Sequence, residues 1–136
     1  MAHLGAYLKD DVCVVILGNV RTGAIDHIKV DLAGLVFGQA AQPPAPRKLV
    51  KVDTRRLDDY VGRYEVFPKL ILTVERRGGD LFLQGTGGDF LPLDPLSETR
   101  FFYRQFYVPV VFDRDAHGEV TRLLWNGDYP CRKIKP

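Results

Sequence analysis

The feature that most constrains this chain is a long series of short strand patterns separated by turn residues, which begins near Lys51. Apolar and polar side chains alternate with a period of two, as in 70–75, and turn residues follow at hairpin spacing. Gly78-Gly79 and Asn126-Gly127 accept the positive φ values that tight hairpins require. The series predicts eight or nine short antiparallel strands.

A sheet of so many strands has to protect its edges. Exposed edge strands pair with other chains, and closing the sheet into a barrel removes both edges. Regular hairpins between consecutive strands are typical of up-and-down barrels. We therefore expect a mainly β fold, built around an eight-stranded antiparallel barrel.

Residues before the barrel follow a different pattern. The first predicted element is 11–18, a continuous β-branched run that predicts a strand covered on both faces. Residues 22–37 carry apolar side chains at the spacing of an amphipathic helix, with Thr22 as its N-cap. Three prolines within 39–50 predict an extended, stiff linker. The predicted organisation is a strand and helix in 1–38, a linker in 39–50 and a barrel in 51–136.

Composition and charge exclude several classes of protein. The 46% of hydrophobic and 26% of charged residues predict a soluble globular chain. A net charge of +2 is too small for a phosphate-binding surface, so we expect no nucleic-acid partner. No apolar run approaches the roughly 20 residues of a membrane-spanning helix. Residues 1–6 show no export signal, and the compartment stays open.

Side chains with catalytic or metal-binding chemistry are few and scattered. The single serine, Ser97, is followed by Arg100 where a base would be needed, and a guanidinium does not accept a proton at neutral pH. Cys13 lies in the apolar strand, where we expect a small core residue. Metal-site spacing is absent among the histidines, which are His3, His27 and His117. We therefore expect no catalytic residue, no metal and no cofactor.

Aromatic residues are concentrated in the barrel half of the chain. An eight-stranded barrel is only just wide enough to be filled by its own side chains, so inward-facing rings are expected to pack its interior. The alternative is a ligand cavity lined by some of the rings, with Trp125 and Tyr103 as the candidate lining residues. We favour the packed interior.

Several phrases, in this order, resemble a known family. They are Tyr60-Val61-Gly62-Arg63-Tyr64, the hairpin 72–84, the stretch Leu91–Phe102 and the stretch Val110–Val120. Together they resemble the lipocalin-like C-terminal domain of serine β-lactamase-like hydrolases, which include class C penicillin-binding proteins and S12 peptidases. Residues 14–19 and the helix after them are similar to the last strand and helix of the catalytic domain.

The resemblance implies a lipocalin-like barrel and an accessory role beside a hydrolase domain. The family's catalytic motifs, Ser-x-x-Lys, Tyr-x-Asn and Lys-Thr-Gly or His-x-Gly, have no counterpart in this sequence. We therefore expect a non-catalytic domain that acts in assembly or in shaping a hydrolase active site. The alternative is a free-standing barrel that binds a small molecule.

The resemblance also bears on partners. In such hydrolases the strand 11–18 and the helix 22–37 would pack on a large sheet. An apolar strand with unpaired backbone groups is a template for further pairing. We expect a symmetric homodimer through this strand and helix, or contact with a serine hydrolase domain.

Overall fold

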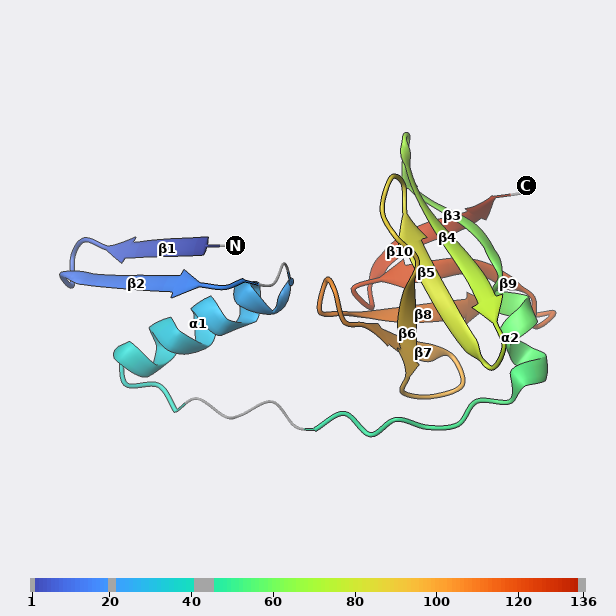
Figure 1. The fold of residues 1–136 in the computed structure, drawn as a ribbon, viewed down its shortest axis with the longest axis horizontal. Helices are drawn as coiled ribbons and strands as arrows, with labels where there is room; N and C mark the ends of the chain where they lie inside the picture. The colour runs from blue at the N-terminus through green and yellow to red at the C-terminus, as the bar shows by residue number, and fades with distance from the viewer. Residues whose placement is uncertain (1, 20–21, 41–45, 135–136) are drawn as a thin grey trace. The chain divides into compact units, whose positions relative to one another are not determined.

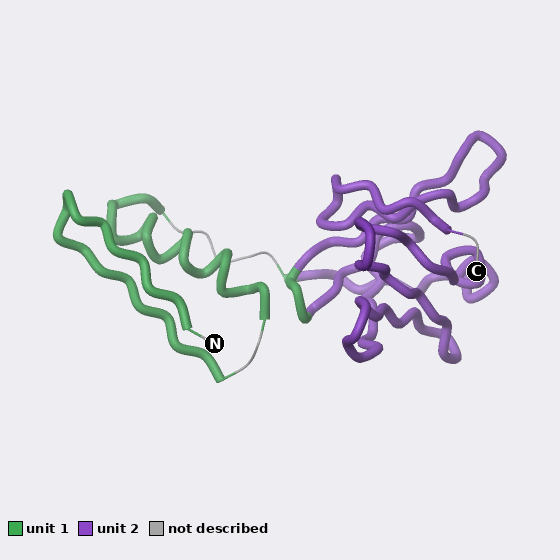
Figure 2. Tube along the Cα trace, turned by 90° about the horizontal axis from the view of Figure 1, so that it is seen from above, with its two compact units in different colours: residues 1–46, 105–107 green, residues 47–104, 108–136 purple. Residues whose placement is uncertain are grey.

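The computed structural model of the 136-residue chain describes residues 2–19, 22–40 and 46–134. The chain divides into two compact units, residues 1–46 with 105–107, and residues 47–104 with 108–136 (Figure 2). Residues 41–45 of the predicted linker lie outside the described residues, so the linker stays a prediction.

The larger unit is a closed antiparallel barrel, as predicted (Figure 1). A short helix, α2 (Thr54–Tyr60), precedes it, and the side chain of Asp53 caps this helix by accepting a hydrogen bond from the backbone N–H of Arg55. The sheet runs β10-β3-β4-β5-β6-β7-β8-β9 and closes where β10 pairs with β3. The strands are β3 (Gly62–Phe67), β4 (Leu70–Arg77), β5 (Asp80–Gly85), β6 (Leu91–Pro95), β7 (Arg100–Tyr103), β8 (Val108–Arg114), β9 (Val120–Trp125) and β10 (Tyr129–Ile134).

Hairpin turns form where the sequence predicts them. Gly78 between β4 and β5 has φ of 63°, and Asn126 and Gly127 between β9 and β10 have φ of 57° and 86°. Two consecutive residues with positive φ match the twist of the strands that they connect.

Side chains from α2 and every strand of the barrel fill its interior. Alternate residues of the strands point inward, as in β4, where Leu72 and Val74 are buried. The ring of Phe112 stacks on that of Tyr60, with centroids 4.4 Å apart. The buried cluster comprises Leu57, Tyr60, Tyr64, Leu72, Val74, Leu81, Leu83, Leu93, Phe101, Tyr103, Val110, Phe112, Val120, Leu123 and Cys131.

The Tyr60–Tyr64 phrase joins α2 to the first barrel strand. Gly62 has φ of 149°, a conformation that favours glycine. The hydroxyl of Tyr64 donates a buried hydrogen bond to the carbonyl of Tyr60 at 2.7 Å. The hydroxyl of Tyr60 in turn donates to the carbonyl of Glu98 at 2.8 Å. The two tyrosines therefore fix the helix and the 97–99 turn to the barrel wall.

The smaller unit holds a strand pair and a helix, and it differs from the prediction. A strand that the sequence did not predict, β1 (Ala2–Tyr7), pairs antiparallel with β2 (Val12–Leu17). Exposure alternates along β2, so this strand is covered on one face and not on both. Cys13 is exposed, which corrects the expectation of a core residue.

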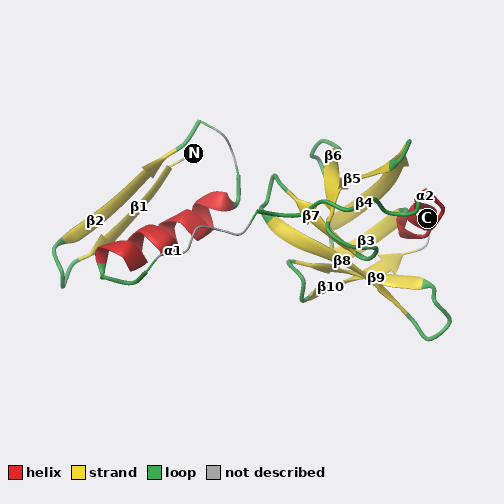
Figure 3. Cartoon of the chain, turned by 90° about the horizontal axis from the view of Figure 1, so that it is seen from below, coloured by secondary structure: helices red, strands yellow, loops and turns green. Residues whose placement is uncertain are grey.

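The helix α1 (Ala24–Val36) packs against this hairpin (Figure 3). Its N-cap is Gly23 rather than Thr22, although the Thr22 hydroxyl accepts a hydrogen bond from the N–H of Ala24 at 3.2 Å. Of the predicted apolar side, only Ile25 is buried. The others keep 37–54% of their surface exposed, and they are Ile28, Leu32, Leu35 and Val36.

Candidate functional site

One face of the β1–β2 hairpin is apolar and bare. Opposed residues of an antiparallel pair point to the same face, and three such pairs are exposed together. They are Ala2 with Leu17, Leu4 with Val15, and Ala6 with Cys13. We call these six residues the bare face. The exposed fractions of Leu4, Val15 and Leu17 are 68%, 55% and 79%.

The opposite face of the hairpin is the one that α1 covers. Val12, Val14 and Ile16 are partly buried, and the ring of Tyr7 contacts Phe37 just beyond α1, with centroids 5.1 Å apart. A hairpin with a helix on one face only cannot bury its other face by itself. A contiguous apolar surface of this kind typically marks an interaction site.

The two predicted ligand-lining residues lie together on the barrel. Tyr103 is 2% exposed, and its hydroxyl donates to the carbonyl of Leu83 at 3.4 Å. Burial raises the pKa of this phenol. The ring of Trp125 packs edge-on against Tyr103, with centroids 5.9 Å apart, and contacts the buried cluster. Their role in ligand binding stays a prediction.

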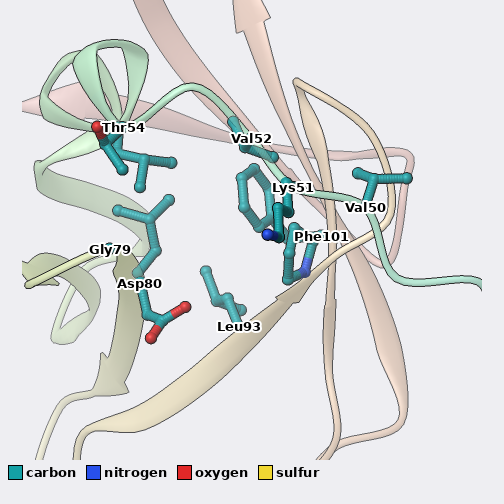
Figure 4. A pocket seen from close by; sticks show the side chains of 11 residues that line it. Val50, Lys51, Val52, Thr54, Gly79, Asp80, Leu93 and Phe101 are labelled. Carbon is teal, nitrogen blue, oxygen red and sulfur yellow. The ribbon is translucent and has the colours of Figure 1, made fainter.

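A pocket of about 240 Å³ lies elsewhere on the barrel (Figure 4). Its apolar surface comes from Leu57, Leu81, Leu93 and Phe101, each no more than 2% exposed. Residues 50–52 border it in extended form, and the N–H of Val50 donates to the carbonyl of Pro95 at 3.0 Å. Lys51 and Asp80 are exposed and lie on opposite sides of the pocket.

The pocket occupies an opening in the barrel wall. Six residue pairs join β4 and β5, whereas only Phe82 with Pro92 and Leu83 with Leu91 join β5 and β6. Beyond these two pairs β5 continues to Asp80 while β6 continues to Pro95. The pocket is lined from both strand ends, and thus lies where the two strands separate.

The residues considered for catalysis do not form a site. Ser97 lies in the turn before β7, where its hydroxyl accepts a hydrogen bond from the N–H of Arg100 at 3.1 Å. His3 is on β1, His27 is on α1 and His117 is in the turn before β9. Among the described residues there is no group of three or more His, Cys, Asp or Glu that could hold a metal ion. The described part of the chain also has no helix of the length and apolarity needed to cross a membrane.

Comparison with known families identifies the barrel. The family model described as a domain of unknown function, DUF3471, matches residues 46–134, which include α2 and all eight barrel strands. The chain belongs to the DUF3471 family. No curated protein matches the chain. The DUF3471 match starts beside the larger structural unit and leaves the β1–β2–α1 unit outside it.

Sequence reasoning missed the bare face and the pocket of this DUF3471 protein for different reasons. The bare face had a signal, because Ala2, Leu4 and Ala6 alternate and the polar pair Asp10-Asp11 separates them from the next strand. The pocket had none, since Lys51 and Asp80 are 29 positions apart in ordinary turn and extended contexts.

Proposed function

We propose that this DUF3471 protein is a non-catalytic accessory module, related to the C-terminal region of serine β-lactamase-like hydrolases, that acts in assembly. The ordered strand phrases of the barrel and the preceding strand and helix support the relationship. The side chains packed inside the barrel support a scaffold rather than a carrier.

The bare face is the observation on which the assembly role depends. Its six residues are small or aliphatic and carry no charge, so a second flat apolar sheet can pack on them at about 10 Å. Two copies of the same face are complementary in this respect, and a two-fold axis would bury both at once. A second copy is the partner that we propose, and a serine hydrolase domain is the other occupant that the resemblance suggests.

Size-exclusion chromatography with light scattering at low micromolar concentration tests the proposed self-association. The expected mass is twice the 15.4 kDa of one chain. A mass of one chain across the concentration range would exclude the dimer and leave the hydrolase domain as the candidate partner.

The absence of catalysis is a separate part of the proposal. A nucleophilic serine needs a base within hydrogen-bond reach, whereas the Ser97 hydroxyl is engaged with the backbone of its own turn. Incubation with a fluorophosphonate probe for activated serines should therefore leave the chain unlabelled. Labelling that disappears in Ser97→Ala would show that the chain is an enzyme.

A further inference from the structure

The pocket between β5 and β6 has the chemistry of a peptide-binding site. From its shape and charge we infer that it binds a short apolar peptide with free amino and carboxyl ends, which lies extended along β5. This inference concerns the barrel alone and does not depend on the assembly role of the bare face.

Backbone geometry supports an extended ligand. The β5–β6 ladder ends at Phe82 and Pro92, while Asp80 and Leu81 continue β5 beyond it. A strand end without a neighbour on one side presents N–H and C=O groups that an added strand can pair with. The segment next to it shows this mode already, since Val50 donates a backbone hydrogen bond to Pro95 at the end of β6.

The apolar surface and the volume set the size of the ligand. Leu57, Leu81, Leu93 and Phe101 line the pocket, and burying an aliphatic side chain against them is favourable. The volume of about 240 Å³ is below the 300–1,000 Å³ or so that is typical of sites for drug-sized ligands. It therefore suits one apolar side chain of a short peptide better than a lipid or a large cofactor.

The rim charges set the ends of the ligand. Lys51 and Asp80 face each other across the pocket (Figure 4), and within the described residues neither forms an ion pair. A carboxylate beside Lys51 and an ammonium beside Asp80 would satisfy both. An extended peptide separates these two charges with its apolar side chain between them, whereas an uncharged or singly charged ligand leaves at least one of them unused.

Titration of the ¹⁵N-labelled chain with the tripeptide Ala-Leu-Ala, followed by two-dimensional NMR, tests the inference. Saturable shifts are expected at residues 79–81, 93–95 and 50–52. Exposed charge pairs contribute about 0.2–1 kcal/mol each, so Lys51→Gln and Asp80→Asn should each weaken Kd by about 1.5- to 5-fold. The acetylated and amidated tripeptide, which lacks both charges, should bind about 2- to 25-fold more weakly.

Two control variants separate the pocket from general charge effects. Lys69→Gln and Asp128→Asn remove the same charges at exposed positions outside the pocket and should leave Kd unchanged. An absence of saturable shifts at the pocket would overturn the inference. So would equal binding by the blocked peptide, or an equal loss in the control variants. None of these results would bear on the oligomeric state.

Discussion

At the residue scale, Tyr64 couples the stability of the barrel to pH. Its side chain is fully buried, and its hydroxyl donates to the Tyr60 carbonyl. Burial raises the pKa of Tyr64, with a smaller contribution from Tyr60. An unfolded tyrosine ionises near pH 10 while the folded one keeps its proton, so the unfolded state binds fewer protons above that pH. The stabilisation is complete below about pH 10 and is lost as pH rises further.

This reasoning predicts how Tyr64→Phe behaves in urea unfolding. Near pH 8 the variant should lose about 1–3 kcal/mol of unfolding free energy, because the buried carbonyl of Tyr60 is left without that donor. Between about pH 9 and pH 11 the variant should lose less stability than the parent, since the parent alone carries the phenol with the raised pKa. Equal losses over this alkaline range would show that Tyr64 does not carry the effect.

The sequence predicts the position of this residue better than its contacts. The Tyr60–Tyr64 phrase marks the start of the barrel, and the structure places the first barrel strand there. The hydrogen bond from Tyr60 to Glu98 joins residues 38 positions apart, and no local pattern reports such a pairing. Gly62 is similar, because its φ of 149° follows from the path between α2 and β3.

At the element scale, the hairpin β1–β2 carries the assembly role. Val15→Lys places a charge at the centre of the bare face, next to Leu4 on the paired strand. Val15 is 55% exposed in the single chain, so the substitution should cost little stability while burial of the new charge opposes association. We expect the variant to be monomeric at concentrations where the parent dimerises.

Thr121→Lys is the matched control for this variant. It adds the same charge at an exposed position of β9 on the barrel, and should leave association unchanged. If both variants associate like the parent, the bare face is not the interface.

Local patterns predict most elements and fail for identifiable reasons. The barrel strands follow from alternation and turn residues, which are properties of adjacent positions. The strand β1 was missed because Ala2, His3, Gly5 and Ala6 have little strand preference. The exposure of Cys13 was missed because an apolar strand does not reveal which of its faces another element covers.

At the scale of the whole molecule, closure of the barrel was predictable and its opening was not. A series of hairpins favours a closed sheet in general terms. The separation of β5 from β6 depends instead on the positions of Leu93 and of the segment 50–52, which sequence spacing does not give. The pocket therefore appears only in the folded chain.

Sedimentation equilibrium of the full chain and of residues 47–136, each over the same dilution series, tests the central claim most directly. The shorter chain contains α2 and all eight barrel strands and lacks the bare face. Because the barrel has its own buried cluster, we expect it to fold and remain monomeric, while the full chain forms a dimer that dissociates on dilution. A monomeric full chain, or a dimer formed equally well by residues 47–136, would contradict assembly through the β1–β2 hairpin.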